Sequence, residues 1–311
     1  MKIVIAGASG LVGSALTPAL RAAGHDVFRL VRGRGARASD EIAWDPAAGE
    51  IDHRRLEGSG AFINLAGENL AAGRWTAARR ERILRSRVDA TRTLVAGMTK
   101  LEQMPRVFLS ASAVGYYGNR GDEVLTEASA IGHGFLSDIC LAWETHADGA
   151  ARLGVRTALL RFGMILAPNG GVLAKMRPVF RLGFGGRLGA GRHYMSWIAM
   201  DDVVGVVGHA LHDARCAGAL NVVAPNPVTN AEFTTAFARA LRRPALVPAP
   251  AWALRIAFGR ALADEALLAS VRAVPERLSR MGYSFRHPSI AAAMAAVLNG
   301  GTDVSRTPIT L

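Results

Sequence analysis

The chain has 311 residues, of which 50% are hydrophobic and 20% charged; this is an ordinary globular composition and excludes wholesale disorder. Its formal net charge is +12, carried mostly by arginines that are scattered through the whole chain. No nucleic-acid-binding motif accompanies the charge, so we expect no nucleic-acid partner and assign most arginines to solvated helix faces. The alternative is that the summed positive field attracts acidic ligands. The densest run of arginines, Arg79–Arg87, is the part best suited to face an anion.

The two cysteines, Cys140 and Cys216, lack the spacing of metal ligands and cannot build a disulfide framework. We therefore expect no metal and a reducing compartment. Met1 runs directly into a strand pattern, which leaves no room for a targeting segment. No stretch reaches the ~18 consecutive apolar residues of a membrane span. These observations predict a cytoplasmic protein without a membrane partner, and they leave the oligomeric state open.

Strand and helix patterns alternate through the first half of the chain. Lys2–Ala6 is a short, continuous apolar run, typical of a strand that is covered on both faces. Thr76 is expected to cap a long helix, and Gly24 to end a shorter one. This alternation implies an α/β fold, a doubly wound parallel sheet with right-handed crossovers. The expected strands are 2–6, 27–31, 61–65, 107–110 and 155–160, and the expected helices are 11–23, 76–101 and 135–153.

The turn between the first strand and the first helix has the spacing GxxGxxG, one residue wider at its first gap than GxGxxG. Gly7 permits a tight turn, Gly10 lets a pyrophosphate approach the backbone, and Gly13 lets the helix pack closely on the sheet. The helix then offers free N–H groups and a positive dipole end to phosphates. The alternative is a plain glycine-rich turn. The residues expected to hold a dinucleotide here are Gly7, Ser9, Gly10, Leu11, Val12 and Gly13.

The end of the second strand predicts which dinucleotide is bound. NAD sites usually place an Asp or Glu there to hold the ribose diol, but this strand ends at Arg32, and Asp26 lies at its start. Arg32, with Arg34 as a second candidate, is suited to pair with a 2′-phosphate. The sequence therefore favours NADP(H) over NAD(H). The alternative is that Arg32 is an ordinary surface arginine.

The second half of the chain has a different character from about residue 161. Glycines cluster over 183–191, strands become sparse, and prolines punctuate a linker at 244–250. Helical patterns return at Asp264–Val271 and Ser289–Leu298. We expect an NAD(P)-binding Rossmann-type domain over 1–240, with substrate-lobe insertions from about 161. A smaller helical C-terminal module would span 241–299, and 300–311 would form a flexible tail.

Three further segments resemble the extended short-chain dehydrogenase/reductase superfamily: Asn64–Gly67, Ser110–Gly118 and Ser196–Asp202. More narrowly, the chain is similar to an atypical branch of the NAD-dependent epimerase/dehydratase superfamily, usually called "epimerase family protein", which carries a C-terminal domain of unknown function. The strings NLAGEN (64–69) and RLGFGGRLGAG (181–191) carry this resemblance, which covers nearly the whole chain. It implies that Leu65, Ala66, Gly67 and Arg87 also contact the cofactor.

That superfamily uses a tyrosine as general acid/base and a lysine four residues later, which stabilises the phenolate. Here the residues four positions after Tyr116, Tyr117, Tyr194 and Tyr283 are Arg120, Gly121, Ile198 and His287, so no YxxxK motif exists. Alignment on Glu144 places Leu136 and Cys140 at the two positions. The serine of the superfamily is present as Ser112. We therefore take Ser112 and Tyr116 as candidate catalytic residues, with Tyr117, Asp138 and Glu144 as further proton carriers.

Each of these residues also has a structural interpretation. Ser112 could satisfy the backbone at a strand end, Tyr116 could pack in the cleft, and Glu144 could pair within the fold. His193 is expected to be a solvated loop histidine. The leading hypothesis is an NADP(H)-binding oxidoreductase or epimerase-like protein that acts on an unidentified small substrate, which Arg187 and Arg192 of the glycine-rich loop suggest to be anionic. The alternative is a non-catalytic NADP(H)-binding sensor or scaffold.

Overall fold

The computed structural model describes residues 1–33, 38–168 and 170–299. Eight strands form one sheet in the order β12-β8-β6-β5-β1-β2-β3-β4, parallel throughout except that β4 is antiparallel to β3. The predicted α/β fold with a parallel sheet is therefore confirmed. The strands are β1 (Lys2–Ala6), β2 (Asp26–Arg32), β3 (Glu41–Asp45), β4 (Glu50–Ile51), β5 (Ala61–Asn64), β6 (Val107–Ala113), β8 (Arg156–Phe162) and β12 (Gly218–Val222).

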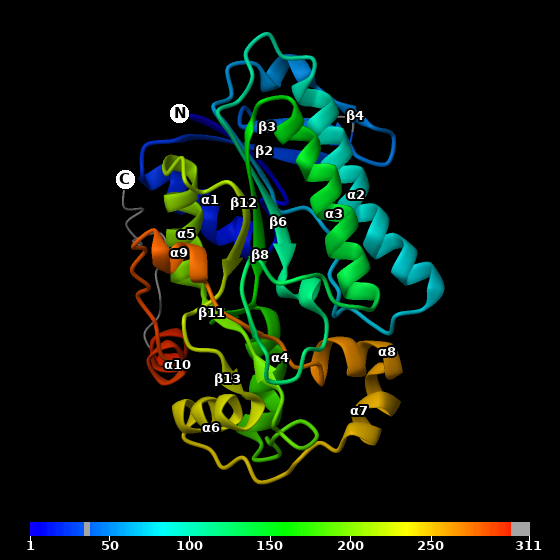
Figure 1. Ribbon diagram of the computed structural model, residues 1–311, viewed down its shortest axis with the longest axis vertical. Coiled ribbons are helices and arrows are strands. Elements are labelled where there is room, and N and C mark those ends of the chain that lie inside the picture. Colours follow the sequence, from blue (N-terminus) through cyan, green and yellow to red (C-terminus); the bar gives the residue numbers. More distant parts are fainter. Residues whose placement is uncertain (34–37, 169, 300–311) are drawn as a thin grey trace.

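Helices cover both faces of this sheet, as the doubly wound prediction requires (Figure 1). On one face, α1 (Leu11–Ala22) and α5 (Met200–His212) share a core with Ile3 and Ile5 of β1. On the other face, α2 (Ala77–Met98) and α3 (Phe135–Arg152) pack on Val4. Alternate residues of β1 thus point into two separate cores, which is why this strand is apolar without interruption.

The direction in which successive strands are added to the sheet changes at β1. From β1 the sheet grows to β2 and β3 on one side, and to β5, β6 and β8 on the other. The connections that follow β1 and β5 therefore leave the sheet in opposite directions. In parallel sheets, ligands bind at the carboxyl ends of the strands at such a point. The residues after Ala6 and after Asn64 mark it here.

A smaller lobe lies beyond the carboxyl ends of the strands (Figure 1). Its core contains Trp197, Phe233 and Phe237, all fully buried. Its paired strands are β9 (Met164–Ala167) with β11 (Trp197–Ala199), β10 (Tyr194–Met195) with β13 (Val228–Thr229), and β14 (Arg272–Ala273) with β7 (Val124–Leu125). Its helices are α4 (Gly171–Arg181), α6 (Asn230–Leu241), α7 (Ala251–Phe258), α8 (Arg260–Leu262) and α10 (Ile290–Asn299), whereas α9 (Glu276–Arg280) returns to the main sheet and packs in the core of α1 and α5.

Several predicted boundaries are confirmed. The hydroxyl of Thr76 accepts a hydrogen bond from the backbone N–H of Arg79 and caps α2, as expected. The helix predicted at 289–298 is α10. Among the described residues, no helix combines the length and the apolar composition that crossing a membrane requires. The domain boundaries at 240 and 299 stay a prediction, and the tail at 300–311 and Arg34 lie outside the described residues.

Two predictions about secondary structure are wrong. Strands do not thin out after residue 161 as far as expected, because β12 joins the main sheet beside β8. The helix expected over Asp264–Val271 is only a short π-helical turn at Ala263–Leu267. Beyond that turn, the N–H of Ser270 donates to Asn119 Oδ1 at 3.0 Å, so tertiary hydrogen bonds draw the chain out of a helix.

Candidate functional site

The glycine turn after β1 has no room for side chains at two of its positions. Gly7 has a φ of +78°, and a Cβ there would lie 2.6 Å from the carbonyl oxygen of Leu65. A Cβ on Gly13 would lie 2.4 Å from the oxygen of Gly7. The N–H of Gly10 donates to that same oxygen at 3.0 Å and closes the turn. Glycine is therefore required where β1 meets the segment after β5 and where α1 meets the turn.

The amino end of α1 remains uncapped. Its N-cap residue is Gly10, which has no side chain to accept from the first helical N–H groups. The lobe approaches this end, because a Cβ on Gly170 would lie 2.4 Å from Leu11 Cδ1. On the same side, Lys175 Nζ of α4 donates to the carbonyl oxygen of Ala71 at 2.6 Å. The helix terminus thus offers free donors and a positive dipole end toward the space between the sheet and the lobe.

A cleft of about 440 Å³ opens at this turn. It brings together seven of the residues predicted to hold a cofactor, while Leu11, Val12, Gly13 and Arg87 lie outside its lining. None of the lining residues is acidic. The predicted lining residues are Gly7, Ser9, Gly10, Arg32, Leu65, Ala66 and Gly67, and the others are Ala8, Arg29, Leu30, Val31 and Trp44.

The two arginines of the cleft differ in their partners. Arg29 donates to Asp40 at 2.9 Å and to Glu41 at 3.2 Å, and its guanidinium holds the pKa of Asp40 at about 2. Arg32 is exposed and makes no ion pair with any described residue. Of the two cleft arginines, Arg32 is therefore the one without a carboxylate partner among the described residues.

Arg87 is a buried cation with neutral partners only. Its guanidinium donates to the carbonyl oxygens of Ile83 at 3.0 Å and Glu68 at 3.1 Å, and it lies over the Trp143 ring. Burial lowers its pKa to about 10. A Cβ on Gly67 would lie 3.0 Å from Arg87 Cζ, so this charge, which the nearby Glu68 carboxylate offsets only in part, lies against the cleft wall. Such a group is suited to hold an anion or a polar ligand atom.

The run of arginines on α2 does not form one anion-facing surface, contrary to expectation. Arg87 is buried, Arg79 and Arg82 each lie 3.5 Å from the carboxylate of Glu68, and Arg85 pairs with Glu81. Helical geometry explains the result, since positions three or four apart share a face and the others do not. Of these arginines, Arg87 is the one that contacts Gly67 of the cleft wall.

Ser112 lies in a buried charged network at the carboxyl end of β6. Its hydroxyl donates to Glu144 Oε1 at 2.6 Å rather than to the strand backbone. Arg161 Nε and Nη2 donate to the two oxygens of Glu144, each at 2.8 Å. All three side chains are buried. Glu144 is thus paired, as its structural interpretation expected, and it orients the Ser112 hydroxyl.

The two neighbouring tyrosines have different environments. Tyr117 donates to Asn221 Oδ1 at 2.7 Å, accepts from Arg161 Nη1 at 3.0 Å, and has its pKa raised by burial, so its hydroxyl is fully committed. Tyr116 stacks on the Arg161 guanidinium, whose Cζ lies 3.5 Å from the centroid of the Tyr116 ring. Its hydroxyl makes no hydrogen bond with any described residue. Of the two, Tyr116 is the phenol available to a ligand.

The positions of the usual catalytic pair carry no acid or base. The Cys140 thiol contacts the oxygen of Ala113 at 3.6 Å, and burial raises its pKa to about 11, so it stays protonated. Leu136 packs in the apolar cluster of Trp75. Asp138 is exposed and takes no part in the network around Ser112.

The backbone of the glycine-rich loop packs against the linker, while the role expected of its arginines stays a prediction. Its backbone pairs with the linker, with Val247 N donating to Gly185 O at 3.1 Å and Ala249 N to Arg187 O at 2.9 Å. A Cβ on Gly186 would lie 1.9 Å from the oxygen of Val247. These glycines therefore permit close backbone contact. The expectation of a solvated His193 is wrong, since the ring is half-buried and its Nε2 has no partner among the described residues.

Sequence reasoning missed Arg29 and Trp44 as lining residues. Trp44 lies on β3, a short strand that carries no motif and borders the cleft only after pairing with β2. Arg29 lies in the ordinary polar–apolar alternation of β2, so nothing in the local sequence distinguishes it from a surface arginine. No signal in the sequence could have found either residue without the order of the strands.

The glycine turn, the uncapped helix and the switch in strand order together define a Rossmann-type protein of the short-chain dehydrogenase/reductase class. The chain belongs to the NAD dependent epimerase/dehydratase family, which matches residues 3–222. Residues 249–297 match a domain of unknown function. The resemblance inferred from the sequence is therefore confirmed.

Relatives share almost the whole chain. It is 46% identical over 292 residues to an epimerase family protein of Mycobacterium bovis, covering 94% of this chain and 96% of that protein. It is 34% identical over 304 residues to the human epimerase family protein SDR39U1, covering 96% and 100%. A crystal structure of human SDR39U1 with NADPH matches with a TM-score of 0.87 at 33% identity, covering 96% of this chain and 100% of that one.

A more distant match shows the fold alone. The structure of MoeE5 in complex with UDP-glucuronic acid and NAD matches with a TM-score of 0.73 at 20% identity, covering 96% of this chain and 97% of that one. The neighbours thus include proteins crystallised with either dinucleotide.

Proposed function

We propose that the protein binds NADP(H) and acts as an oxidoreductase or epimerase-like protein on an unidentified small, anionic substrate. One observation carries the proposal: an uncapped helix end and an unpaired Arg32 share a cleft whose lining has no carboxylate. The residues proposed to hold the cofactor are Gly7, Ser9, Gly10, Leu11, Val12, Gly13, Arg32, Leu65, Ala66, Gly67 and Arg87.

The preference for NADP(H) depends on Arg32. A ribose diol is usually held by a carboxylate, which the cleft lining lacks, whereas a 2′-phosphate needs a cation. The presence of NADPH in the human SDR39U1 structure supports this choice, while more distant neighbours bind NAD. The buried Arg87 would hold a further polar part of the cofactor beside Gly67.

The cofactor, when bound, supplies hydride chemistry, and the protein would position the reacting groups. We propose Ser112 and Tyr116 for this role. Because Ser112 donates to Glu144, its oxygen can accept from a hydroxyl of the substrate but does not itself donate. Tyr116, whose hydroxyl is free of partners among the described residues, would carry the proton.

A non-catalytic sensor or scaffold is the second candidate. The buried thiol of Cys140 at the usual lysine position and the committed hydroxyl of Tyr117 favour it, since neither group can exchange a proton near neutral pH. If this protein binds NADPH but consumes none of it with any carbonyl compound of a broad panel, the sensor or scaffold is the better description.

Arg32→Ala tests the cofactor proposal. Loss of the charge-assisted contacts to a 2′-phosphate should raise the dissociation constant for NADPH about tenfold and leave that for NADH unchanged. Fluorescence titration of both nucleotides measures this. Arg106→Ala is the matched control, because Arg106 is an exposed arginine without an ion pair among the described residues. An unchanged NADPH preference in Arg32→Ala would refute the role of Arg32.

A further inference from the structure

Large apolar side chains are exposed at the far end of the lobe. Their exposed fractions range from 48% for Val247 to 81% for Leu246, which is unusual for a set of this size. They come from the end of α4 and the loop after it, from the linker at 242–250, and from α7. We call them the apolar tip: Leu182, Phe184, Leu246, Val247, Trp252 and Ile256.

The three segments of the apolar tip are neighbours. The backbone of Val247 is hydrogen-bonded to that of Gly185, and the linker continues directly into α7. Trp252 and Ile256 lie four residues apart on one face of α7, while Leu254 between them is buried. In Figure 1 the linker and α7 lie at the end of the long axis opposite to the N-terminus. The apolar tip is therefore one protruding surface.

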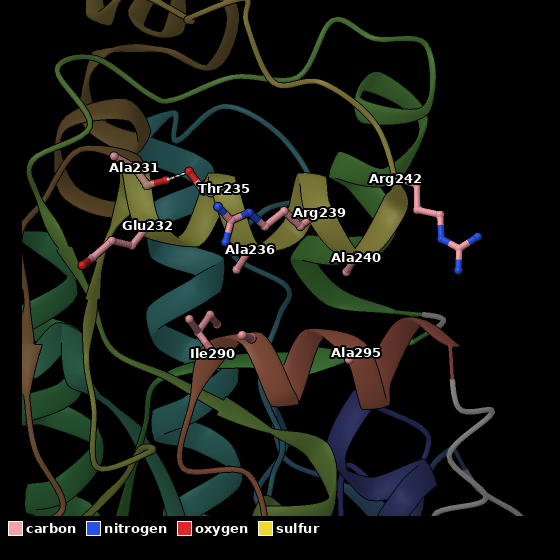
Figure 2. A pocket seen from close by; sticks show the side chains of 10 residues that line it. Ala231, Glu232, Thr235, Ala236, Arg239, Ala240, Arg242, Ile290 and Ala295 are labelled. Atoms are coloured by element: carbon pink, nitrogen blue, oxygen red, sulfur yellow. Dashed lines mark hydrogen bonds between the residues drawn. The ribbon is translucent and has the colours of Figure 1, made fainter.

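The charges around the apolar tip are mostly positive. The sequence has no Asp or Glu between Asp148 and Asp201, nor between Glu232 and Asp264. Arg255 pairs with Asp264 at 2.8 Å. Arg260, just after α7, lies 3.6 Å from the same carboxylate. Four further arginines around the tip make no ion pair with any described residue, and Figure 2 shows one of them, Arg242, directed away from α6 and α10. These unpaired cations are Arg181, Arg187, Arg242 and Arg243.

A small pocket of about 320 Å³ adjoins the tip, between α6 and the linker. Arg187 lines it together with Thr234 and Thr235, and Leu246 forms part of its rim. Thr234 is only 4% exposed, and its Oγ1 is buried without a hydrogen-bond partner among the described residues. A buried, unsatisfied hydroxyl beside an unpaired guanidinium is suited to bind an oxyanion such as a phosphate.

We propose that the apolar tip binds the surface of an anionic phospholipid bilayer, with a headgroup phosphate in the pocket of Arg187 and Thr234. Apolar and aromatic side chains would enter the boundary between headgroups and acyl chains, and the surrounding arginines would contact the anionic headgroups. This departs from the expectation of no membrane partner, which rested on the lack of a spanning segment. The proposal is independent of the cofactor.

Charge and shape favour a bilayer over other occupants. A second copy would bring the same unpaired arginines face to face, at a cost that an anionic lipid surface does not have. A partner helix needs a groove, and the groove of about 630 Å³ between α6 and α10 includes none of the tip residues in its lining (Figure 2).

Co-sedimentation of the full chain with lipid vesicles tests the proposal. The protein should sediment with vesicles made of equal parts phosphatidylcholine and phosphatidylglycerol, not with phosphatidylcholine alone, and sodium chloride should release it. The double variant Trp252→Ser, Ile256→Ser should lose at least about tenfold in partitioning. Leu141→Ser is the matched control, since Leu141 is 48% exposed on α3, away from the tip.

A second pair of variants tests the pocket. Arg187→Gln should weaken vesicle binding about fivefold, the contribution of one arginine near an anionic surface, while Arg106→Gln, with the same change in net charge, should not. Thr234→Val should weaken binding while keeping the fold, which circular dichroism checks. Inorganic phosphate that raises the melting temperature, without any vesicle binding, would mean a free anion as ligand and would overturn the proposal.

Two further results would also overturn it. One is equal sedimentation with both kinds of vesicle, or with neither. The other is a dimer in analytical ultracentrifugation that Trp252→Ser, Ile256→Ser abolishes, because the tip would then cover a second copy of the chain.

Discussion

The pair of Glu144 and Arg161 holds more of this site in place than any other pair of side chains. Two parallel hydrogen bonds join them, and only 8% and 5% of their side chains are exposed. Arg161 also orients both Tyr116 and Tyr117, and Glu144 orients Ser112. A buried charge without its partner retains its full desolvation cost, so each residue of the pair depends on the other.

Glu144→Ala should therefore be strongly destabilising. It leaves the Arg161 guanidinium buried and unpaired, at a cost of about 3–5 kcal/mol in the free energy of unfolding. The double variant Glu144→Met, Arg161→Met should recover much of this loss, because apolar side chains of similar volume need no partner. Urea denaturation measures both. A double variant as unstable as Glu144→Ala would show that the ion pair itself stabilises the folded chain, beyond cancelling the desolvation cost of its two charges.

At the scale of elements, the sequence predicts what is local. The glycine turn, its strand and its helix fall within residues 2–22 and were placed correctly, because the spacing of glycines and apolar residues expresses one backbone geometry. The cap at Thr76 is equally local. The site residues Gly7 and Ser9 follow from the same spacing.

Other parts of the fold depend on contacts between distant segments. β3 and β12 are short and lie at or near the edges of the sheet, so their sequences show little periodicity. Trp44 enters the cleft only through the pairing of β3 with β2. The network of Ser112 joins β6, α3 and β8, and no spacing in the sequence reveals that Arg161 is the partner of Glu144.

The ends of α1 and α5 meet at a pair of histidines. The rings of His25 and His212 stack with centroids 5.6 Å apart, and the N-terminal amine lies 3.4 Å from His25 Nδ1. Burial lowers the pKa of both rings, the amine adds to this for His25, and Arg156 does so for His212. The unfolded chain, with ordinary histidine pKa values near 6.5, therefore binds more protons than the folded one.

Stability should accordingly fall as the pH is lowered through about 6.5, where the unfolded histidines begin to take up protons. His25→Gln should reduce this dependence. The fall in melting temperature between pH 8 and pH 5.5 should be about 1–2 °C smaller in the variant than in the natural chain, a small effect because both rings are partly exposed. Thermal melts across this range measure it. His133→Gln, at an exposed loop histidine, is the control. Identical pH profiles for His25→Gln and the natural chain would contradict the explanation.

At the scale of the whole molecule, the C-terminal segment is built into the first 240 residues rather than placed beside them. Leu278, fully buried, belongs to the same core as β1 and α1. Ser196 donates to the oxygen of Val271 at 2.8 Å and accepts from the N–H of Ala273 at 2.8 Å. The Glu127 carboxylate accepts from backbone N–H groups on both sides of this division.

From these contacts we expect that the module at 241–299 cannot be removed without loss of the fold. A chain that ends at residue 240 would expose the core surface under Leu278, leave β7 without its partner strand, and leave α6 without α10. We expect it to lose the cooperative thermal transition of the full chain and the NADPH binding proposed above, since the lobe that approaches Leu11 would no longer be held. Circular dichroism melts and NADPH fluorescence measure the two. A truncated chain that melts cooperatively near the temperature of the full one would instead establish residues 1–240 as an independent domain, because separate folding units keep their stability when divided.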